Sequence, residues 1–215
     1  MTLSDSTRAN LRRSDSIHLI QTRLAEGAVV KEAMRRDPEF PSVLADIAAA
    51  IVEAYSTGGK VLLFGNGGSA ADAQHVAAEL VGRFSKERKP LAAVALNTNM
   101  SCVTALSNDY SFAEVFERQI QALGRPGDVA IGISTSGDSE NVIRALDSAK
   151  AQGLVTVAFT GSSGGRLKGS VDYCLRVPSN DTAHIQEGHV TCGHIMCELV
   201  ELGLFGGDRT RMNGD

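Results

Sequence analysis

Residues 61–80 read VLLFGNGGSAADAQHVAAEL, and residues 129–147 read VAIGISTSGDSENVIRALD. Each stretch begins with a short apolar run, continues through a turn of Gly, Ser and Asn, and ends in a segment with the apolar spacing of a helix. A short, continuously apolar strand that leads directly into a helix is typical of a parallel sheet covered on both faces. The two stretches therefore predict an α/β fold.

The same alternation extends along the rest of the chain. Apolar runs lie at residues 60–64, 91–96, 128–133, 154–159 and 171–177. Helical patterns lie at residues 69–84, 100–106, 112–123, 140–152 and 182–204. We therefore predict a three-layer α/β/α sandwich with a five-stranded, mainly parallel sheet.

Two further helices are predicted before the first strand. Apolar residues recur at helical spacing between residues 16 and 36, where Asp37-Pro38 ends the run, and a second apolar helix spans residues 41–55. We divide the chain into an N-terminal helical arm, residues 1–40, and one domain, residues 41–215, that carries the sheet. A length of 215 residues suits one domain with such an arm.

Composition and charge exclude several classes of protein. Hydrophobic residues make up 43% of the chain and charged residues 21%, as in globular proteins. The net charge is −4 and only 5% of the residues are aromatic, so we expect no nucleic-acid partner. The sequence has no run of 18 apolar residues and no apolar leader after its polar N-terminus, so we expect a cytoplasmic protein with no membrane partner.

A loop rich in hydroxyl groups is a candidate phosphate site. The first N–H groups of a helix lack intrahelical partners, and the helix dipole places a partial positive charge there, so phosphate binds readily at this end. The loop Ser134-Thr135-Ser136-Gly137-Asp138-Ser139 opens a predicted helix and carries four hydroxyls in six residues. A helix cap needs only one of them, so we favour a phosphate site over a simple cap.

The first loop is rich in glycine. Gly65-Asn66-Gly67-Gly68-Ser69-Ala70 formally matches the GxGxxA pattern of dinucleotide-binding folds, which would require an acidic residue after the second strand. The chain has Ala95-Leu96-Asn97 there and no GK[ST] P-loop, so we expect no nucleotide cofactor. The glycines instead let the backbone approach a ligand closely, while Asn66 and Ser69 supply side-chain hydrogen bonds.

Four polar side chains on two helices form a candidate reaction centre. His75 and Glu79 are four residues apart on one helix face, and Gln186 and His194 share a face of the last helix about two turns apart. Glu79 and His194 suit an acid/base pair, whereas His75, Glu79 and His194, with Gln186 as a weaker donor, suit zinc. The two roles compete for the same lone pairs. His75 and Glu79 alone also fit an ordinary helix pair.

Four motifs in this order resemble the phosphoheptose isomerases of the sugar isomerase (SIS) domain superfamily. They read FGNGGSAADAQHVAAELVGRF, SNDYSF, GISTSGDSENVIRAL and IQEGHVTCGH, and the resemblance runs from about Ser16 to Leu204. The resemblance implies a flavodoxin-like SIS fold. It also implies conversion of D-sedoheptulose 7-phosphate to D-glycero-D-manno-heptose 7-phosphate through an enediol, the first step of nucleotide-activated heptose synthesis.

The resemblance implies roles for individual residues. It makes Glu79 and His194 the catalytic acid/base pair, and it implies one zinc ion per subunit, bound by His75, Glu79, Gln186 and His194. Family members are homotetramers with active sites between subunits, which makes the arm an assembly element. Substrate contacts are implied for Asn66, Gly67, Gly68, Ser69, Glu79, Asn108, Asp109, Ser134, Thr135, Ser136, Ser139 and Gln186.

The sequence departs from the family pattern at two positions. His184 stands where the family commonly has Arg, and Ala183 where some members have an acid, so family contacts of those side chains do not carry over. From the helix face alone, His184 and His189 are predicted at the surface or in an interface.

Two other functions remain as alternatives. A non-catalytic, DnaA-associating SIS protein shares the loops but lacks counterparts of Glu79 and His194. The other alternative is that the chain is an isomerase of a different sugar phosphate.

Overall fold

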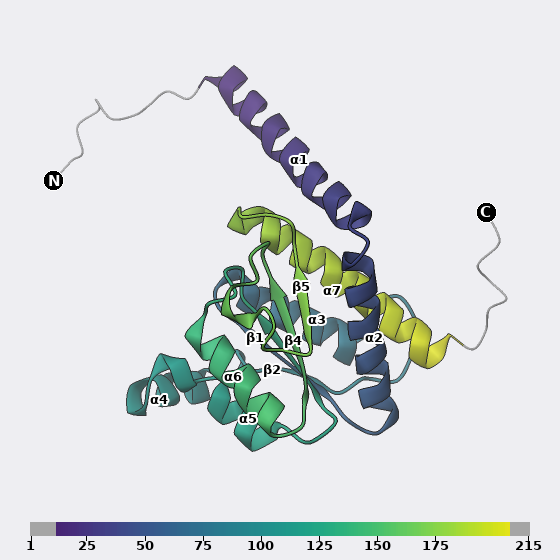
Figure 1. The fold of residues 1–215 in the computed structure, drawn as a ribbon, viewed down its shortest axis with the longest axis vertical. Helices are drawn as coiled ribbons and strands as arrows, with labels where there is room; N and C mark the ends of the chain where they lie inside the picture. The colour runs from purple at the N-terminus through teal and green to yellow at the C-terminus, as the bar shows by residue number, and fades with distance from the viewer. Residues whose placement is uncertain (1–11, 207–215) are drawn as a thin grey trace.

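The computed structural model describes residues 12–206 and has the predicted α/β/α architecture (Figure 1). Its strands are β1 (Val61–Gly65), β2 (Ala93–Ala95), β3 (Val129–Ile133), β4 (Val155–Thr160) and β5 (Tyr173–Arg176). Its α-helices are α1 (Arg13–Arg36), α2 (Phe40–Ser56), α3 (Gly68–Val81), α4 (Met100–Asp109), α5 (Glu117–Leu123), α6 (Glu140–Ala151) and α7 (Thr182–Phe205), with 3₁₀ helices η2 (Phe112–Glu114) and η3 (Gly165–Leu167). The ends of the predicted arm and domain, residues 1–11 and 207–215, lie outside the described residues.

The sheet is parallel throughout, with strand order β2-β1-β3-β4-β5. This is the flavodoxin-like order, in which the chain reverses its direction of winding between β1 and β3. These two strands pair from Val61 with Val129 to Gly65 with Ile133. Their carboxyl ends therefore lie side by side, and so do the two loops predicted to bind the ligand.

Both faces of the central strands are buried. In β1, Val61 and Leu63 pack into a core with α2, α3 and α7, whereas Leu62 and Phe64 pack into a second core with α5 and α6. Successive side chains of a strand point to opposite faces, so a sheet covered by helices on both sides needs apolar residues at every position. This explains why the strands read as unbroken apolar runs.

Helix α1 has little contact with the rest of the chain. Only Gly27 and Met34 of this helix are buried, and it projects away from the sheet (Figure 1). Its exposed apolar side chains, 46–71% accessible, are Ile17, Leu19, Ile20, Leu24 and Val29. The apolar stripe that predicted this helix is thus largely uncovered by the described part of the chain. None of the helices between residues 12 and 206 has the length and apolar character needed to cross a membrane.

The prediction that the third helix continues to residue 84 is wrong. Helix α3 ends at Val81, and Gly82 follows as its C-cap. The guanidinium of Arg88 donates hydrogen bonds to the carbonyl oxygens of Glu79, Leu80 and Gly82 at 2.8–3.1 Å. These carbonyls have no intrahelical partner at a helix end, and a cation there also complements the helix dipole.

The prediction that His184 and His189 lie at the surface or in an interface is also wrong for a single chain, because α7 is covered by the sheet and by α1. His189 is 1% exposed and donates from Nε2 to the Thr160 carbonyl at 3.1 Å. Burial lowers the pKa of His189 to about 4, although the Thr160 contact opposes this, so the imidazole is neutral at pH 7. The buried His184 lies 3.4 Å from the Glu26 carboxylate of α1.

A buried carboxylate connects the amino ends of β1 and β3. Asp128 accepts hydrogen bonds from the backbone N–H of Lys60 at 2.9 Å and of Arg125 at 2.8 Å. It also pairs with the Lys60 ammonium at 2.5 Å, and its side chain is 3% exposed. Removing the acceptor would leave three donors without a partner.

We expect Asp128→Ala to lower the free energy of unfolding by about 2–3 kcal/mol, because a buried charge loses its counterpart. Urea denaturation, with an unchanged dependence on denaturant, measures this loss. Asp46→Ala on the exposed side of α2 is the control and should change stability by less than about 0.5 kcal/mol. Equal losses in both variants would contradict the role assigned to Asp128.

Candidate active site

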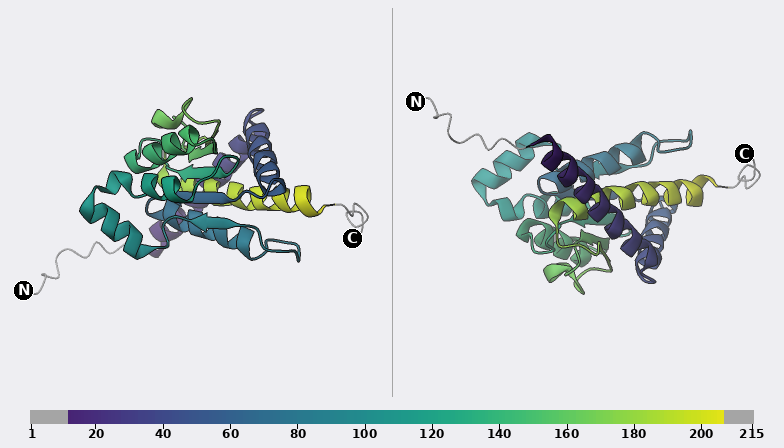
Figure 2. Two further views of the ribbon diagram at one scale, coloured as in Figure 1. Left: turned by 90° about the horizontal axis from the view of Figure 1, so that it is seen from below. Right: turned by 90° about the horizontal axis from the view of Figure 1, so that it is seen from above.

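Helices α3 and α7 lie side by side and run in the same direction (Figure 2). The first residue of α3, Gly68, touches Gln186 near the start of α7, and Val76 touches Gly193 further along. A side chain at Gly68 would overlap the Gln186 amide, and a Cβ at Gly193 would come within 2.7 Å of Val76 Cγ2. The two glycines therefore permit the close approach of the helices.

Three of the predicted site residues meet between these helices. His75 Nε2 lies 2.7 Å from His194 Nε2 and 3.7 Å from Glu79 Oε1. One donor atom from each of the three residues lies within 4.8 Å of the others. An ordinary contact between residues i and i+4 of one helix would account for His75 and Glu79, but it does not account for His194, which contacts His75 from α7.

The donor set of this triad fits zinc. Zinc prefers imidazole nitrogen and carboxylate oxygen ligands, and catalytic zinc sites have three protein ligands and one open position. His75, Glu79 and His194 supply two nitrogens and one carboxylate oxygen at converging positions. These residues therefore could hold a zinc ion without a change of fold.

Gln186 lies at a different level of the same helix pair. Its amide contacts Gly68, which precedes His75 by seven residues of α3, or about 10 Å of helical rise. The structure thus brings together three of the four predicted zinc ligands and places Gln186 beside the first loop. Its membership of the zinc site stays a prediction.

The serine-rich loop forms a cluster of hydroxyls between β3 and α6. Ser134 Oγ lies 2.9 Å from Ser139 Oγ and 3.5 Å from Ser136 Oγ. Ser139 occupies the N-cap of α6, yet its side chain makes no capping hydrogen bond. Three hydroxyls therefore converge at a helix start instead of capping it, and this is the donor arrangement that a phosphate group needs.

A pair of amides connects the two loops. Asn66 and Asn141 exchange hydrogen bonds in both directions, each 2.9 Å long. Asn141 is 3% exposed and was not predicted from the sequence, because it follows the acidic Glu140 in the first turn of α6, where a polar side chain is ordinary. The pairing uses one donor and one acceptor of Asn66, which leaves one N–H and one lone pair for a ligand.

Asn97 supports the first loop from β2. Its amide Nδ2 donates to the Gly65 carbonyl at 2.8 Å, while its buried Oδ1 has no partner among the described residues. This is the position where a dinucleotide-binding fold would carry its acidic residue. The side chain here holds the loop backbone.

The remaining predicted substrate residues lie in two different places. Thr135 and Ser136 line a hollow of about 260 Å³ that is shared with the loop after β4. Asn108 and Asp109 form the end of α4, and both are exposed. Asn108 donates to Asp109 at 2.9 Å, and no hydrogen bond within residues 12–206 joins either one to the two loops.

A second residue that sequence reasoning missed is Phe84. Its ring is stacked on the His194 imidazole, with ring centroids 5.5 Å apart and an interplanar angle of 29°. The contact joins residues that are far apart in the sequence, so local patterns carry no signal for it.

The chain is similar in sequence to a known family of proteins. The model of the SIS domain family matches residues 29–161. The phosphoheptose isomerase of Aquifex aeolicus is 61% identical over 162 residues, which cover 75% of this chain and 85% of the relative. That of Thermodesulfovibrio yellowstonii is 53% identical over 180 residues, or 84% of this chain and 89% of the relative.

Solved structures give the same result. A phosphoheptose isomerase from Francisella tularensis superposes with a TM-score of 0.83 at 37% identity, and one from Neisseria gonorrhoeae with 0.81 at 41% identity. Each superposition covers 86% of this chain and 97% of the other chain.

We expect Gly193→Ala to weaken zinc binding by about tenfold or more, because the added Cβ separates α3 from α7 and so moves His194 away from His75. Competition against a chelating dye measures the affinity. The double variant Val76→Ala/Gly193→Ala removes the clashing methyl groups and should recover most of it. Equal zinc affinity in the wild type and Gly193→Ala would show that the helix approach does not control the triad.

Proposed function

Because the chain belongs to the phosphoheptose isomerases of the SIS domain family, we propose that it converts D-sedoheptulose 7-phosphate to D-glycero-D-manno-heptose 7-phosphate. It is an isomerase that acts on a heptose phosphate, in the synthesis of heptose. The observation that carries the proposed chemistry is the convergence of His75, Glu79 and His194 within 4.8 Å of one another.

The phosphate group is anchored by the loop between β3 and α6. The hydroxyl of Ser134 and those of Ser136 and Ser139, which lie 3.5 and 2.9 Å from Ser134 Oγ, supply donors, and the free N–H groups at the start of α6 supply more. No Lys or Arg is needed, because the helix dipole and neutral hydrogen-bond donors stabilise the phosphate dianion locally. Gly67, Gly68 and Ser69 of the first loop, together with Gln186, contact the sugar chain.

The reacting carbons lie at the other end of the substrate. In an extended heptulose 7-phosphate, C1 is about 9 Å from phosphorus, given single bonds of about 1.5 Å. His75 lies about 10 Å along α3 from the first loop, at 1.5 Å per residue. The open-chain sugar is therefore long enough to span the distance along α3 from the first loop to the level of the triad.

Glu79 and His194 carry the proton transfers. One of them removes a proton from C1, the C–H electron pair forms the C1–C2 double bond, and the carbonyl oxygen O2 takes up a proton to give the enediol. The hydroxyl at O1 then loses its proton as the C1 carbonyl forms, and C2 receives a proton. The other residue assists the transfer between O1 and O2, so no proton is gained or lost overall.

Zinc is the proposed cofactor, one per subunit, held by His75, Glu79 and His194; Gln186, which lies beside Gly68, would have to move to become a further ligand. When bound, zinc supplies a Lewis acid that polarises the sugar oxygens. The carboxylate of Glu79 has a second oxygen, which stays able to accept a proton while the first binds the metal. When Nε2 of His194 binds the metal, its imidazole has no spare lone pair, so in that state Glu79 alone would accept and return the proton and His194 would serve as a ligand.

The two alternative functions fit the site less well. A non-catalytic, DnaA-associating SIS protein lacks counterparts of Glu79 and His194, whereas both are present here and meet in one site. An isomerase of another sugar phosphate would use the same loops, so substrate comparison is needed to separate it from the heptose enzyme.

We propose that the chain forms a homotetramer in the cytoplasm with active sites between subunits. The proposal is supported by α1, whose apolar residues Ile17, Ile20 and Leu24 are 46–71% exposed. A helix of this kind is stabilised when the apolar stripe is covered by a partner. Residues such as Asn108 and Asp109, which lie away from the loops of their own chain, would then serve a neighbouring subunit.

We expect the purified chain to turn over sedoheptulose 7-phosphate with a kcat/KM about tenfold or more above that for fructose 6-phosphate or arabinose 5-phosphate. Elemental analysis of the same sample should find close to one zinc per chain, and chelation should lower the rate. Faster turnover of a shorter sugar phosphate would favour the second alternative. A pure, folded sample that isomerises none of the three would favour the non-catalytic protein.

We expect Glu79→Gln and His194→Gln each to lower kcat by about 100-fold or more, because each removes a side chain that transfers a proton or would bind the metal. Circular dichroism should show an unchanged fold in both variants. Glu198→Gln, on the exposed side of α7, is the matched control and should keep wild-type turnover. Wild-type rates in both site variants would overturn the assignment.

A further inference from the structure

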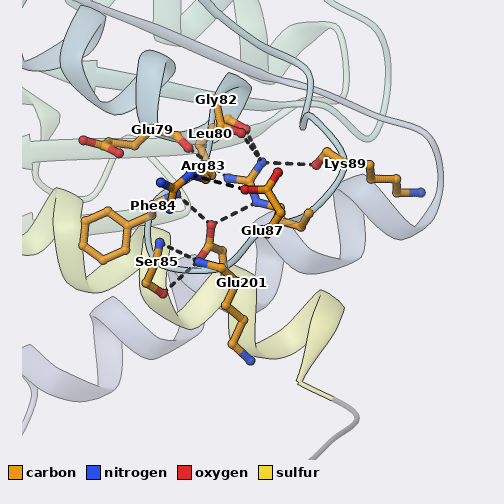
Figure 3. A network of polar contacts seen from close by, with 11 residues as sticks. Glu79, Leu80, Gly82, Arg83, Phe84, Ser85, Glu87, Lys89 and Glu201 are labelled. Carbon is orange, nitrogen blue, oxygen red and sulfur yellow. Dashed lines mark hydrogen bonds and ion pairs between the residues drawn. The ribbon is translucent and has the colours of Figure 1, made fainter.

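The segment after α3 is held by a buried carboxylate of α7 (Figure 3). Glu201, which is fully buried, accepts hydrogen bonds from the backbone N–H of Phe84 at 2.8 Å and of Ser85 and Lys86 at 2.9 Å. Burial raises the pKa of this carboxyl, but these hydrogen bonds outweigh burial and lower it to about 2. The group is therefore a carboxylate at neutral pH, and the backbone around Phe84 is fixed to α7.

Arg88 completes this network. Its side chain is 2% exposed and pairs with Glu201 at 3.0 Å, and it also donates to the backbone carbonyl of Glu79 at 2.9 Å. One guanidinium thus joins the end of α3, which carries Glu79, to the end of α7, beyond His194. Exchanging a buried ion pair for apolar residues is often neutral or stabilising, so stability alone does not explain why this one is present.

The network ends on the His194 ring. Phe84 stacks on one face of the imidazole, with centroids 5.5 Å apart, while the ring of His75 meets His194 edge-on with centroids 5.0 Å apart. His194 sits on a helix and can rotate about its side-chain bonds unless neighbours restrict it. Among the described residues, these two rings are the aromatic contacts of His194.

We propose that Phe84 is a positioning residue, which holds the His194 imidazole with Nε2 toward His75 and Glu79, and that Glu201 and Arg88 hold Phe84 in place. Phe84 acts through His194, on which its ring stacks. Because residues that orient metal ligands tune affinity and rate, its loss affects the triad more than it affects the fold. The kinetic part of this inference rests on the proposed function.

The test compares three variants. Phe84→Leu keeps an apolar side chain and removes the flat ring, Phe84→Tyr restores the ring, and Phe116→Leu removes a fully buried phenyl ring that packs on Phe64 in the other core. Phe84→Leu should weaken zinc binding and lower kcat, each by about tenfold, with KM for the sugar phosphate nearly unchanged. Phe84→Tyr should restore both. Phe116→Leu should lower the urea midpoint and leave zinc affinity and kcat unchanged.

Two measurements test the role of Phe84 independently of the proposed function: the zinc affinity and a crystal structure of the variant. Zinc affinity, measured with a chelating dye, requires no substrate. A crystal structure of Phe84→Leu requires neither, and should show His194 in a different rotamer with Nε2 no longer beside His75. Retention of the His194 rotamer, or equal losses of zinc affinity in Phe84→Leu and Phe116→Leu, would overturn the proposal.

Discussion

The close, parallel packing of α3 and α7 is the constraint on which the candidate site depends. Gly68 and Gly193 keep the helices near one another, because any larger side chain at either position would collide with Gln186 or Val76. At the far end, Glu201 on α7 holds the backbone that follows α3. Neither helix carries a complete site, so the geometry of the triad is a property of the contact between them.

The candidate site contains neutral hydrogen-bond donors at the edge of the sheet and ionisable side chains further along α3. At the carboxyl edge, where winding reverses between β1 and β3, backbone N–H groups and the hydroxyls of residues 134–139 present neutral donors at a helix start. Further along α3, ionisable side chains converge in the proposed reaction centre. This division explains how a chain with a net charge of −4 suits an anionic substrate: attraction is local and does not depend on the overall charge.

Features that depend on local periodicity were predictable from the sequence, and features that depend on distant contacts were not. Strand β3 was predicted to within one residue because its unbroken apolar run has only one explanation in a covered parallel sheet. The face shared by His75 and Glu79 follows from helix geometry, but the 2.7 Å approach of His75 to His194 needed the packing of two helices. The end of α3, the burial of His189 and the pairing of Asn66 with Asn141 all depend on partners at least eight residues away, mostly on other elements.

The order of synthesis has a consequence for how the site forms. Helix α7 follows every strand in the chain, and it supplies His194, Glu201 and much of the cover for one face of the sheet. Until α7 leaves the ribosome, the apolar side of α3, including Val76 and Leu80, has no cover from it, and the triad lacks one of its three members. Nascent chains interrupted before residue 182 would therefore be inactive and prone to self-association, and would be substrates for chaperones and proteases.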